Sequence, residues 1–180
     1  MFNEMELTGT KDVVLVDEND EVLGTMEKLQ AHQEGRLHRA FSVVIFNAKN
    51  EMLIHKRASN KYHCGGMWTN ACCSHPRLNE SPKSAALRRM QEEMGFTTPI
   101  EYVGQFIYRT EFENGLIENE LDHIFVGRFN DEPIPNPEEV EDYKYIGIDE
   151  LKADIENRPQ MYTVWFKKIV HEYLNELIEL

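Results

Sequence analysis

The sequence predicts an α/β domain in which mostly antiparallel strands are covered by helices. Three observations support this fold class: short β-branched runs separated by turns, a helix with clear start and stop signals, and a C-terminal apolar stripe with helical spacing. No internal boundary divides the 180 residues. We therefore expect one domain over residues 1–180, with an N-terminal extension over about residues 1–12.

The first half of the chain predicts two strand pairs. Residues 13–17 and 22–25 flank an acidic turn, and residues 40–47 form a strongly apolar run. A turn joins this run to a strand at residues 52–56. The next segment, residues 61–76, holds two His and all three Cys with little periodicity, which is typical of a loop that carries chemistry.

A helix in the middle of the chain is delimited at both ends. Ser81 is the expected N-cap, Pro82 fits the first helical position, and Gly95 ends the helix after Met94. The second half then predicts strands at residues 102–109, 120–129 and 143–146, a solvated acidic loop at 131–142, and helices at 148–155 and 161–180.

Composition narrows the range of partners. The 19 Lys and Arg against 32 Asp and Glu give a net charge of −13, which disfavours nucleic acid or an anionic membrane as a partner. The three cysteines are odd in number and two are adjacent, so we expect a reducing compartment. No signal peptide or membrane-length apolar run is found, and a cytoplasmic location is expected.

Several His and Glu residues are candidate metal ligands. His32 and His38 precede the apolar strand, and Glu118 and Glu120 lie two apart, on one face of a strand. Together with His75 they would form a mixed nitrogen and oxygen shell that suits Mn²⁺, Mg²⁺ or Zn²⁺. No single spacing establishes this shell, and solvated side chains are the alternative interpretation.

Three further residues combine unusual chemistry with an apolar context. Glu93 follows the core positions of its helix and opposes the helix dipole, which is typical of a functional site. Cys73 lies two residues before His75, although a small buried side chain is the simpler interpretation. Trp165 belongs to the apolar stripe of the last helix, and core packing alone would explain it.

Four motifs together resemble a known family. The segment WTNACCSHP at 68–76 and the segments at 36–41 and 115–120 resemble those of type I isopentenyl-diphosphate isomerases. Glu80 with residues 88–96 resembles the Nudix box as that family modifies it. The similarity runs from about Val13 to Trp165. It implies a Nudix-type α/β/α sandwich with mixed, mostly antiparallel sheets.

The resemblance also implies an activity and residue roles. The activity is the interconversion of isopentenyl and dimethylallyl diphosphate in isoprenoid precursor biosynthesis. The implied metal ligands are His32, His38, His75, Glu118 and Glu120, with Mg²⁺ on the substrate diphosphate near Glu93. The implied catalytic groups are Cys73 and Glu120, with Tyr108 supporting Glu120 and Trp165 facing the reacting carbon. The implied diphosphate ligands are Lys28, Arg57, Lys61 and Arg89.

The expected proton donor to isopentenyl diphosphate is Glu120 with Tyr108, and the expected base is Cys73. The sequence also departs from the usual pattern. Arg89 stands where a Nudix hydrolase has a metal-binding Glu, and Ser74 replaces the leading Gly of the box. Two customary prolines are missing, because the turn before Trp68 reads Cys64-Gly65-Gly66 and Val164 precedes Trp165.

Two other functions remain alternatives. One is a Nudix hydrolase of a nucleoside diphosphate derivative, and the other is a non-catalytic Nudix-fold interaction module. The hydrolase would release phosphate products. The expected partner is a small diphosphate substrate, and the expected assembly is a monomer or weak dimer.

Overall fold

The computed structural model describes residues 12–61 and 63–180, so the expected N-terminal extension lies outside it except for Asp12. In chain order the elements are β1 (Asp12–Val16), β2 (Val22–Glu27), α1 (Lys28–Glu34), β3 (His38–Phe46), β4 (Met52–Arg57), β5 (Trp68–Thr69), β6 (Cys72–Ser74), α2 (Pro82–Met94), β7 (Ile100–Glu111), β8 (Ile117–Arg128), β9 (Val140–Ile146), α3 (Ile148–Asn157), a 3₁₀ turn (Pro159–Met161) and α4 (Val164–Glu179).

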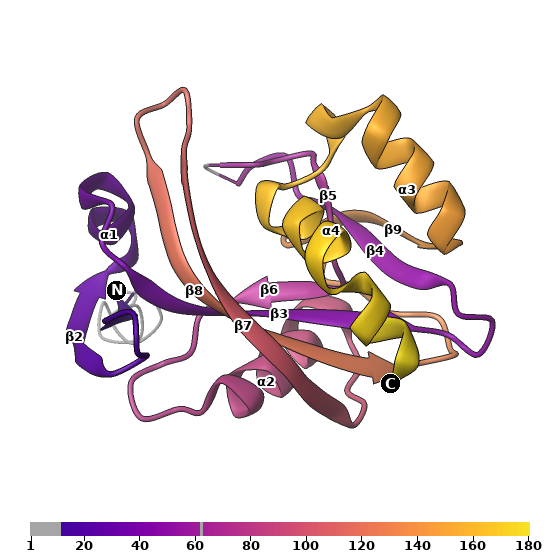
Figure 1. The fold of residues 1–180 in the computed structure, drawn as a ribbon, viewed down its shortest axis with the longest axis horizontal. Coiled ribbons are helices and arrows are strands. Elements are labelled where there is room, and N and C mark those ends of the chain that lie inside the picture. Colours follow the sequence, from indigo (N-terminus) through magenta and orange to yellow (C-terminus); the bar gives the residue numbers. More distant parts are fainter. Residues whose placement is uncertain (1–11, 62) are drawn as a thin grey trace, which may run out of the picture.

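Strand β3 organises the sheet (Figure 1). Along one side it pairs in parallel with β8, which pairs antiparallel with β7. Along the other side it pairs antiparallel with β6, and its end turns into β4. The β1–β2 pair joins β3 near His38, while β4 continues the sheet through β5 and β9.

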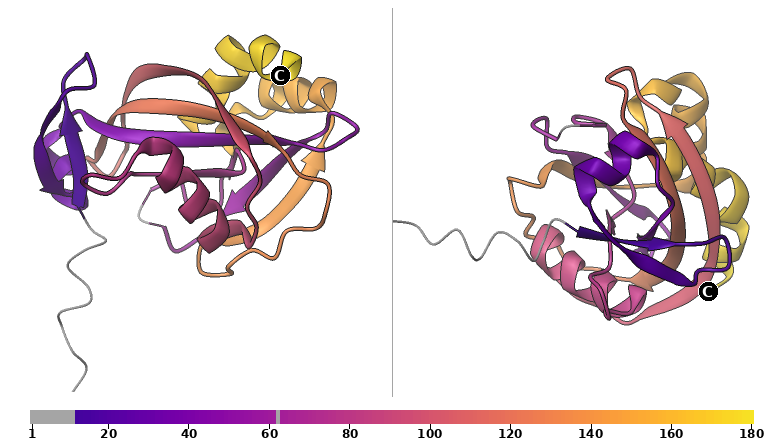
Figure 2. Two further views of the ribbon diagram at one scale, coloured as in Figure 1. Left: turned by 90° about the horizontal axis from the view of Figure 1, so that it is seen from below. Right: turned by 90° about the vertical axis from the view of Figure 1, so that its left-hand side faces the viewer.

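The expected three layers are present. Helices α2 and α4 lie on opposite sides of the strands (Figure 2). Side chains of β3 alternate between the two faces, so Val43 packs in the cluster with Met90 of α2 and Val44 packs in the cluster with Phe166 of α4. Full burial of such a side chain contributes about 1.5–3 kcal/mol, so these two interfaces hold the sandwich together.

The ends of α2 are those that the sequence predicts. The Ser81 hydroxyl accepts a hydrogen bond from the Ser84 amide, and Gly95 has φ 75° at the C-cap. A Cβ atom on Gly95 would lie 2.2 Å from the Ile134 carbonyl oxygen, so this position excludes a side chain.

Other elements differ from the prediction. Helix α1 was not predicted, because it is two turns long and buries only Ala31 and His32, which leaves no apolar periodicity to read. The segment 61–76 was expected to be a loop, yet β5 and β6 lie within it; each is two or three residues long and exists through pairing with a longer strand. Among the described residues, no helix is long and apolar enough to span a membrane.

Candidate active site

A cavity of about 350 Å³ opens where the strands meet α1, α2 and α4. It is lined by residues from separate elements, and most of the residues predicted as functional are among them. These are Lys28, Arg57, Lys61, Cys73, His75, Arg89, Glu93, Tyr108, Glu118, Glu120 and Trp165. The two remaining candidates, His32 and His38, are fully buried.

Strand register places a tyrosine, a carboxylate and an imidazole in one row. Glu120 of β8 pairs with Tyr108 of β7 on one side and with His38 of β3 on the other. Paired residues share a face of the sheet, so the three side chains stand next to one another. The Tyr108 hydroxyl donates to Glu120 Oε2 at 2.6 Å and lies 3.0 Å from Glu118 Oε2.

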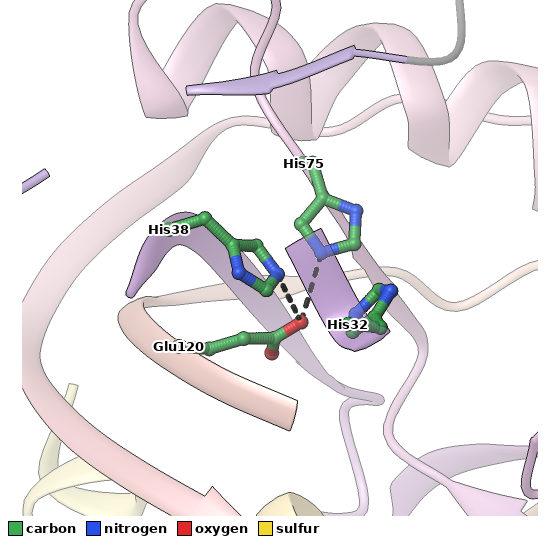
Figure 3. Close-up of side chains that lie close together, drawn as sticks. All are labelled: His32, His38, His75 and Glu120. Atoms are coloured by element: carbon green, nitrogen blue, oxygen red, sulfur yellow. Dashed lines mark hydrogen bonds and ion pairs between the residues drawn. The ribbon is translucent and has the colours of Figure 1, made fainter. Parts of the chain in front are cut away.

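A cluster of imidazoles surrounds the other oxygen of Glu120. Its Oε1 atom lies 2.8 Å from His75 Nε2 and 3.3 Å from His38 Nε2 (Figure 3). His32 joins from α1, one turn after Lys28 on the same helix face. Potential ligand atoms of the three histidines and Glu120 all lie within 4.8 Å of one another, which fits a divalent cation.

Glu118 belongs to a second, overlapping group. Its ligand atoms lie within 4.8 Å of those of His32 and His63. His63 Nε2 is 3.1 Å from Glu118 Oε1. His63 was not predicted as a functional residue, because its spacing to the other candidates matches no metal motif. The five predicted ligands thus fall into two neighbouring groups: His32, His38, His75 and Glu120 lie together, and Glu118 lies with His32 and His63.

The environment sets the protonation of these groups. Burial lowers the pKa of His32 to about 4 and that of His75 to about 3, so both imidazoles are neutral at pH 7 and have a lone pair for a cation. Burial and the charge of Glu120 raise the pKa of Glu118. Burial also disfavours the charged form of Glu120, but hydrogen bonds from His38 and His75 outweigh it and lower its pKa.

Cys73 reaches the same cavity from the other side of β3. It pairs with Ser42 across the β3–β6 ladder, and its sulfur lies 3.8 Å from Arg57 Nη1. Burial raises the pKa of the Cys73 thiol to about 12, while the Arg57 charge opposes the shift. The neighbouring Cys72 is fully buried in the core beside α2, so only the second cysteine of the pair faces the cavity.

Trp165 lies in the first turn of α4 and is 3% exposed. Its ring centroid lies 6.4 Å from that of Tyr108 and 5.4 Å from the Arg57 guanidinium carbon. The indole thus forms an aromatic wall beside the proton-transfer candidates. Its burial in the apolar stripe agrees with core packing as well, and the two roles are compatible.

Positive charge gathers at another part of the wall. Arg89 pairs with Glu93, which is buried on the apolar side of α2 as predicted. Glu139 accepts a hydrogen bond from Lys61, and its Oε1 lies 3.5 Å from Arg89 Nη2. Glu139 was predicted to lie in a solvated loop, but it bridges the side chains of Lys61 and Arg89 at the cavity.

The chain is similar to known proteins in sequence and in fold. A NUDIX domain model matches residues 36–166. A Photorhabdus laumondii protein named isopentenyl-diphosphate Delta-isomerase 2 is 52% identical over 159 residues, which cover 88% of this chain and 90% of that protein. An isopentenyl-diphosphate Delta-isomerase of Pectobacterium atrosepticum is 47% identical over 156 residues, covering 87% of each chain.

The chain belongs to the isopentenyl-diphosphate Delta-isomerases of the Nudix superfamily.

Solved structures share the fold of this isomerase at low sequence identity. A Deinococcus radiodurans protein has a TM-score of 0.74 at 18% identity, covering 89% of this chain and 97% of that one. A MutT protein from Methanosarcina mazei has a TM-score of 0.65 at 18% identity, covering 78% and 94%. These two likenesses confirm the Nudix fold of the isomerase and carry no information about its substrate.

Proposed function

We propose that this isomerase interconverts isopentenyl diphosphate and dimethylallyl diphosphate in the cavity of about 350 Å³. One observation carries the proposal: Cys73 and Glu120, from different strands, line the same cavity together with four Lys and Arg side chains. The reaction needs two proton-transfer groups and a site for the anionic diphosphate. Cys73 and Glu120 are candidates for the first need, and the Lys and Arg side chains for the second.

The cationic residues would bind the diphosphate. Charge-assisted hydrogen bonds to the phosphate oxygens would come from Lys28, Arg57, Lys61 and Arg89. The chain as a whole has a net charge of −13, so this group is a local concentration of positive charge. Glu93 would hold a Mg²⁺ ion shared with the phosphate oxygens. Glu139 occupies Lys61 and Arg89 in the structure, so we propose that the diphosphate takes over these contacts.

The histidine cluster would hold a second cation. The proposed ligands are His32, His38, His75, Glu118 and Glu120, and this mixture of donors suits Mn²⁺, Mg²⁺ or Zn²⁺. A divalent cation at this position supplies positive charge that keeps both carboxylates ionised.

The chemistry transfers two protons and no other group. A proton added to the terminal methylene carbon of isopentenyl diphosphate converts the double bond into a tertiary carbocation at the adjacent carbon. Loss of a proton from the carbon on the diphosphate side then forms the new double bond. Trp165 offers a π face for the cation, and the buried wall excludes water that would capture it.

The protonation of the two groups in the structure differs from the starting state expected from the sequence, because Cys73 is a thiol and Glu120 a carboxylate. Glu120 is surrounded by Tyr108, His38 and His75, which stabilise its carboxylate form. Cys73 carries its proton in the buried thiol. We propose that Cys73 and Glu120, assisted by Tyr108, transfer the two protons: from this protonation state Cys73 donates to isopentenyl diphosphate and Glu120 accepts, whereas the direction expected from the sequence starts from the opposite state. The roles exchange in the reverse reaction.

The expected setting of the isomerase remains a proposal as well. We propose a single domain that acts in the cytoplasm on a small diphosphate, as a monomer or weak dimer, without nucleic acid or membrane. Cys64, Cys72 and Cys73 are free thiols in the structure.

Product analysis tests the proposal against the hydrolase alternative. The Mn²⁺- and Mg²⁺-loaded protein is incubated with isopentenyl diphosphate, and the products are separated and assayed for phosphate. We expect dimethylallyl diphosphate at an equilibrium ratio and no phosphate release. Release of phosphate from this substrate or from a nucleoside diphosphate derivative, without isomerisation, would contradict the proposal.

A further inference from the structure

His63 is a buried histidine at the cavity that the proposed reaction does not use. It lies between β4 and β5, next to Cys64 in the chain, and its side chain lines the cavity. Its side chain is 6% exposed, and its Nε2 atom lies 3.1 Å from Oε1 of Glu118, whose side chain is 4% exposed. A polar contact with so little solvent has a well-defined geometry.

Ring contacts fix the orientation of this imidazole. It lies parallel to the Phe112 ring, at an angle of 4° and a centroid distance of 5.2 Å. It meets the His32 ring edge-on at 5.5 Å and the Trp165 ring edge-on at 6.4 Å. These contacts keep the Nε2 edge of the ring directed toward Glu118. The contacting rings come from α1, α4 and the turn between β7 and β8.

Glu118 has a polar neighbour at each of its carboxylate oxygens. Tyr108 Oη lies 3.0 Å from Oε2, and His63 Nε2 lies 3.1 Å from Oε1. A carboxylate that binds a cation is ionised and can only accept hydrogen bonds, so Nε2 of His63 must carry the proton in that state. Such outer partners orient metal-binding side chains and contribute to metal affinity.

We propose that His63 is a positioning residue of the metal centre, which orients Glu118 for the cation by donating a hydrogen bond to Oε1. This inference rests on the metal centre of the proposed function. Direct ligation by His63 is the alternative role, because a potential ligand atom of His63 also lies within 4.8 Å of those of His32 and Glu118. The proposed role also differs from simple packing, which the stacked Phe112 ring would provide for any planar side chain.

Three full-length variants separate these roles. His63→Phe keeps a planar ring against Phe112 and removes the donor, and His63→Gln restores an N–H group on a side chain of similar reach. His171→Gln, at an exposed position of α4, is the matched control. The measurements are the Mn²⁺ dissociation constant, from the free Mn²⁺ signal in electron paramagnetic resonance, and the visible spectrum of the Co²⁺-saturated protein.

We expect His63→Phe to weaken Mn²⁺ binding about 10–100-fold, with the shape of the Co²⁺ spectrum retained. His63→Gln should recover most of the affinity, and His171→Gln should match the unmodified protein. Unchanged Mn²⁺ affinity in His63→Phe would overturn the inference in favour of packing. A Co²⁺ spectrum that shows the loss of one nitrogen ligand would overturn it in favour of direct ligation.

The outcome is independent of the catalytic assay. If the unmodified protein binds Mn²⁺ but forms no dimethylallyl diphosphate, the proposed function fails while the affinity comparison still decides the role of His63. If the unmodified protein isomerises its substrate and His63→Phe binds Mn²⁺ normally, the inference fails alone.

Discussion

Arg57 Nη1 lies 3.8 Å from the sulfur of Cys73. The same guanidinium approaches the face of Trp165 and lines the cationic part of the cavity. One side chain thus connects the thiol, the aromatic wall and the proposed diphosphate site. Its charge favours the thiolate, but burial has the larger effect and keeps the thiol protonated.

The protonation of Cys73 can be measured directly. Its pKa of about 12 lies above the ordinary 9.0, so the folded protein should show no Cys73 thiolate between about pH 6 and pH 9. The check is the ultraviolet absorbance of thiolate in the unmodified protein minus that in Cys73→Ala. Because the folded pKa is raised, this thiol should also make the unfolding free energy fall as the pH rises above 9. A thiolate signal at neutral pH would contradict the prediction.

Replacement of Cys73 should abolish isomerisation without loss of the fold. Cys73→Ala removes one of two proton-transfer groups, which typically lowers kcat by 10²–10⁴-fold. Cys72→Ala is the matched control, because Cys72 is fully buried and packs against the α2 side of the core. We expect the control to lose about 1 kcal/mol of stability and to keep its activity. Retained activity in Cys73→Ala would refute the assignment.

Glu120→Gln should affect both catalysis and metal binding. The amide cannot accept the transferred proton and is a weaker ligand, so we expect kcat to fall by at least 10²-fold and Mn²⁺ binding to weaken. Glu111→Gln, on an exposed part of β7, should change neither. Steady-state kinetics and Mn²⁺ titration check the pair. An active Glu120→Gln protein with normal metal content would rule out both roles.

The Arg89–Glu93 pair should respond as a unit. Glu93 is 5% exposed and pairs with Arg89. Arg89→Met would leave the Glu93 carboxylate buried without its cationic partner. We expect this change to lower the free energy of unfolding by about 3 kcal/mol. The double change Arg89→Met with Glu93→Leu should recover most of this stability and still bind diphosphate weakly, seen as a raised KM. Denaturant unfolding measures the stability of the single and double variants, and steady-state kinetics measures their KM. Equal stability of the single and double variants would contradict the coupling.

Acid should destabilise the protein through its buried histidines. Burial lowers the pKa of His55 to about 3, and its Nδ1 contacts the Ala71 carbonyl oxygen at 3.1 Å. As the pH falls below about 6.5 the unfolded chain binds a proton that folded His55 does not, so the unfolding free energy decreases until about pH 3. His55→Gln should reduce this slope by up to about 1.4 kcal/mol per pH unit. Urea unfolding from pH 7 to pH 5 measures it, with His171→Gln as control. Parallel curves for His55→Gln and the unmodified protein would contradict the prediction.

Much of the fold could be predicted because local signals agree with tertiary packing. The caps of α2 lie at Ser81 and Gly95, and the apolar stripe of the last helix packs on the sheet as expected. Helix α1 could not be predicted, because it has too few buried residues to show periodicity. Strands β5 and β6 exist only through pairing with β4 and β3, which a local pattern does not contain.

The candidate site could be predicted only in part, because sequence motifs identify residues but do not show which of them meet in the fold. Most of its residues came from motifs that resemble a family, while their meeting at one cavity depends on strand order. His63 and Glu139 escaped prediction since neither stands at a diagnostic spacing. His63 acquires its setting from Phe112 and Glu118, which lie about fifty residues later in the chain. Glu139 acquires its setting from Lys61 and Arg89.

The pairing of Glu120 with Tyr108 and His38 has a consequence for how the chain tolerates length changes. Side chains alternate along β8, so inserting or deleting one residue between Ile117 and Glu120 would turn Asn119 toward the cavity and the carboxylate toward the opposite layer. An extra residue in the hairpin tip at Asn114 leaves that alternation unchanged. Single-residue insertions and deletions along this hairpin should therefore be tolerated at the tip. Within residues 117–120 they should inactivate the protein, because they shift the strand register by one residue.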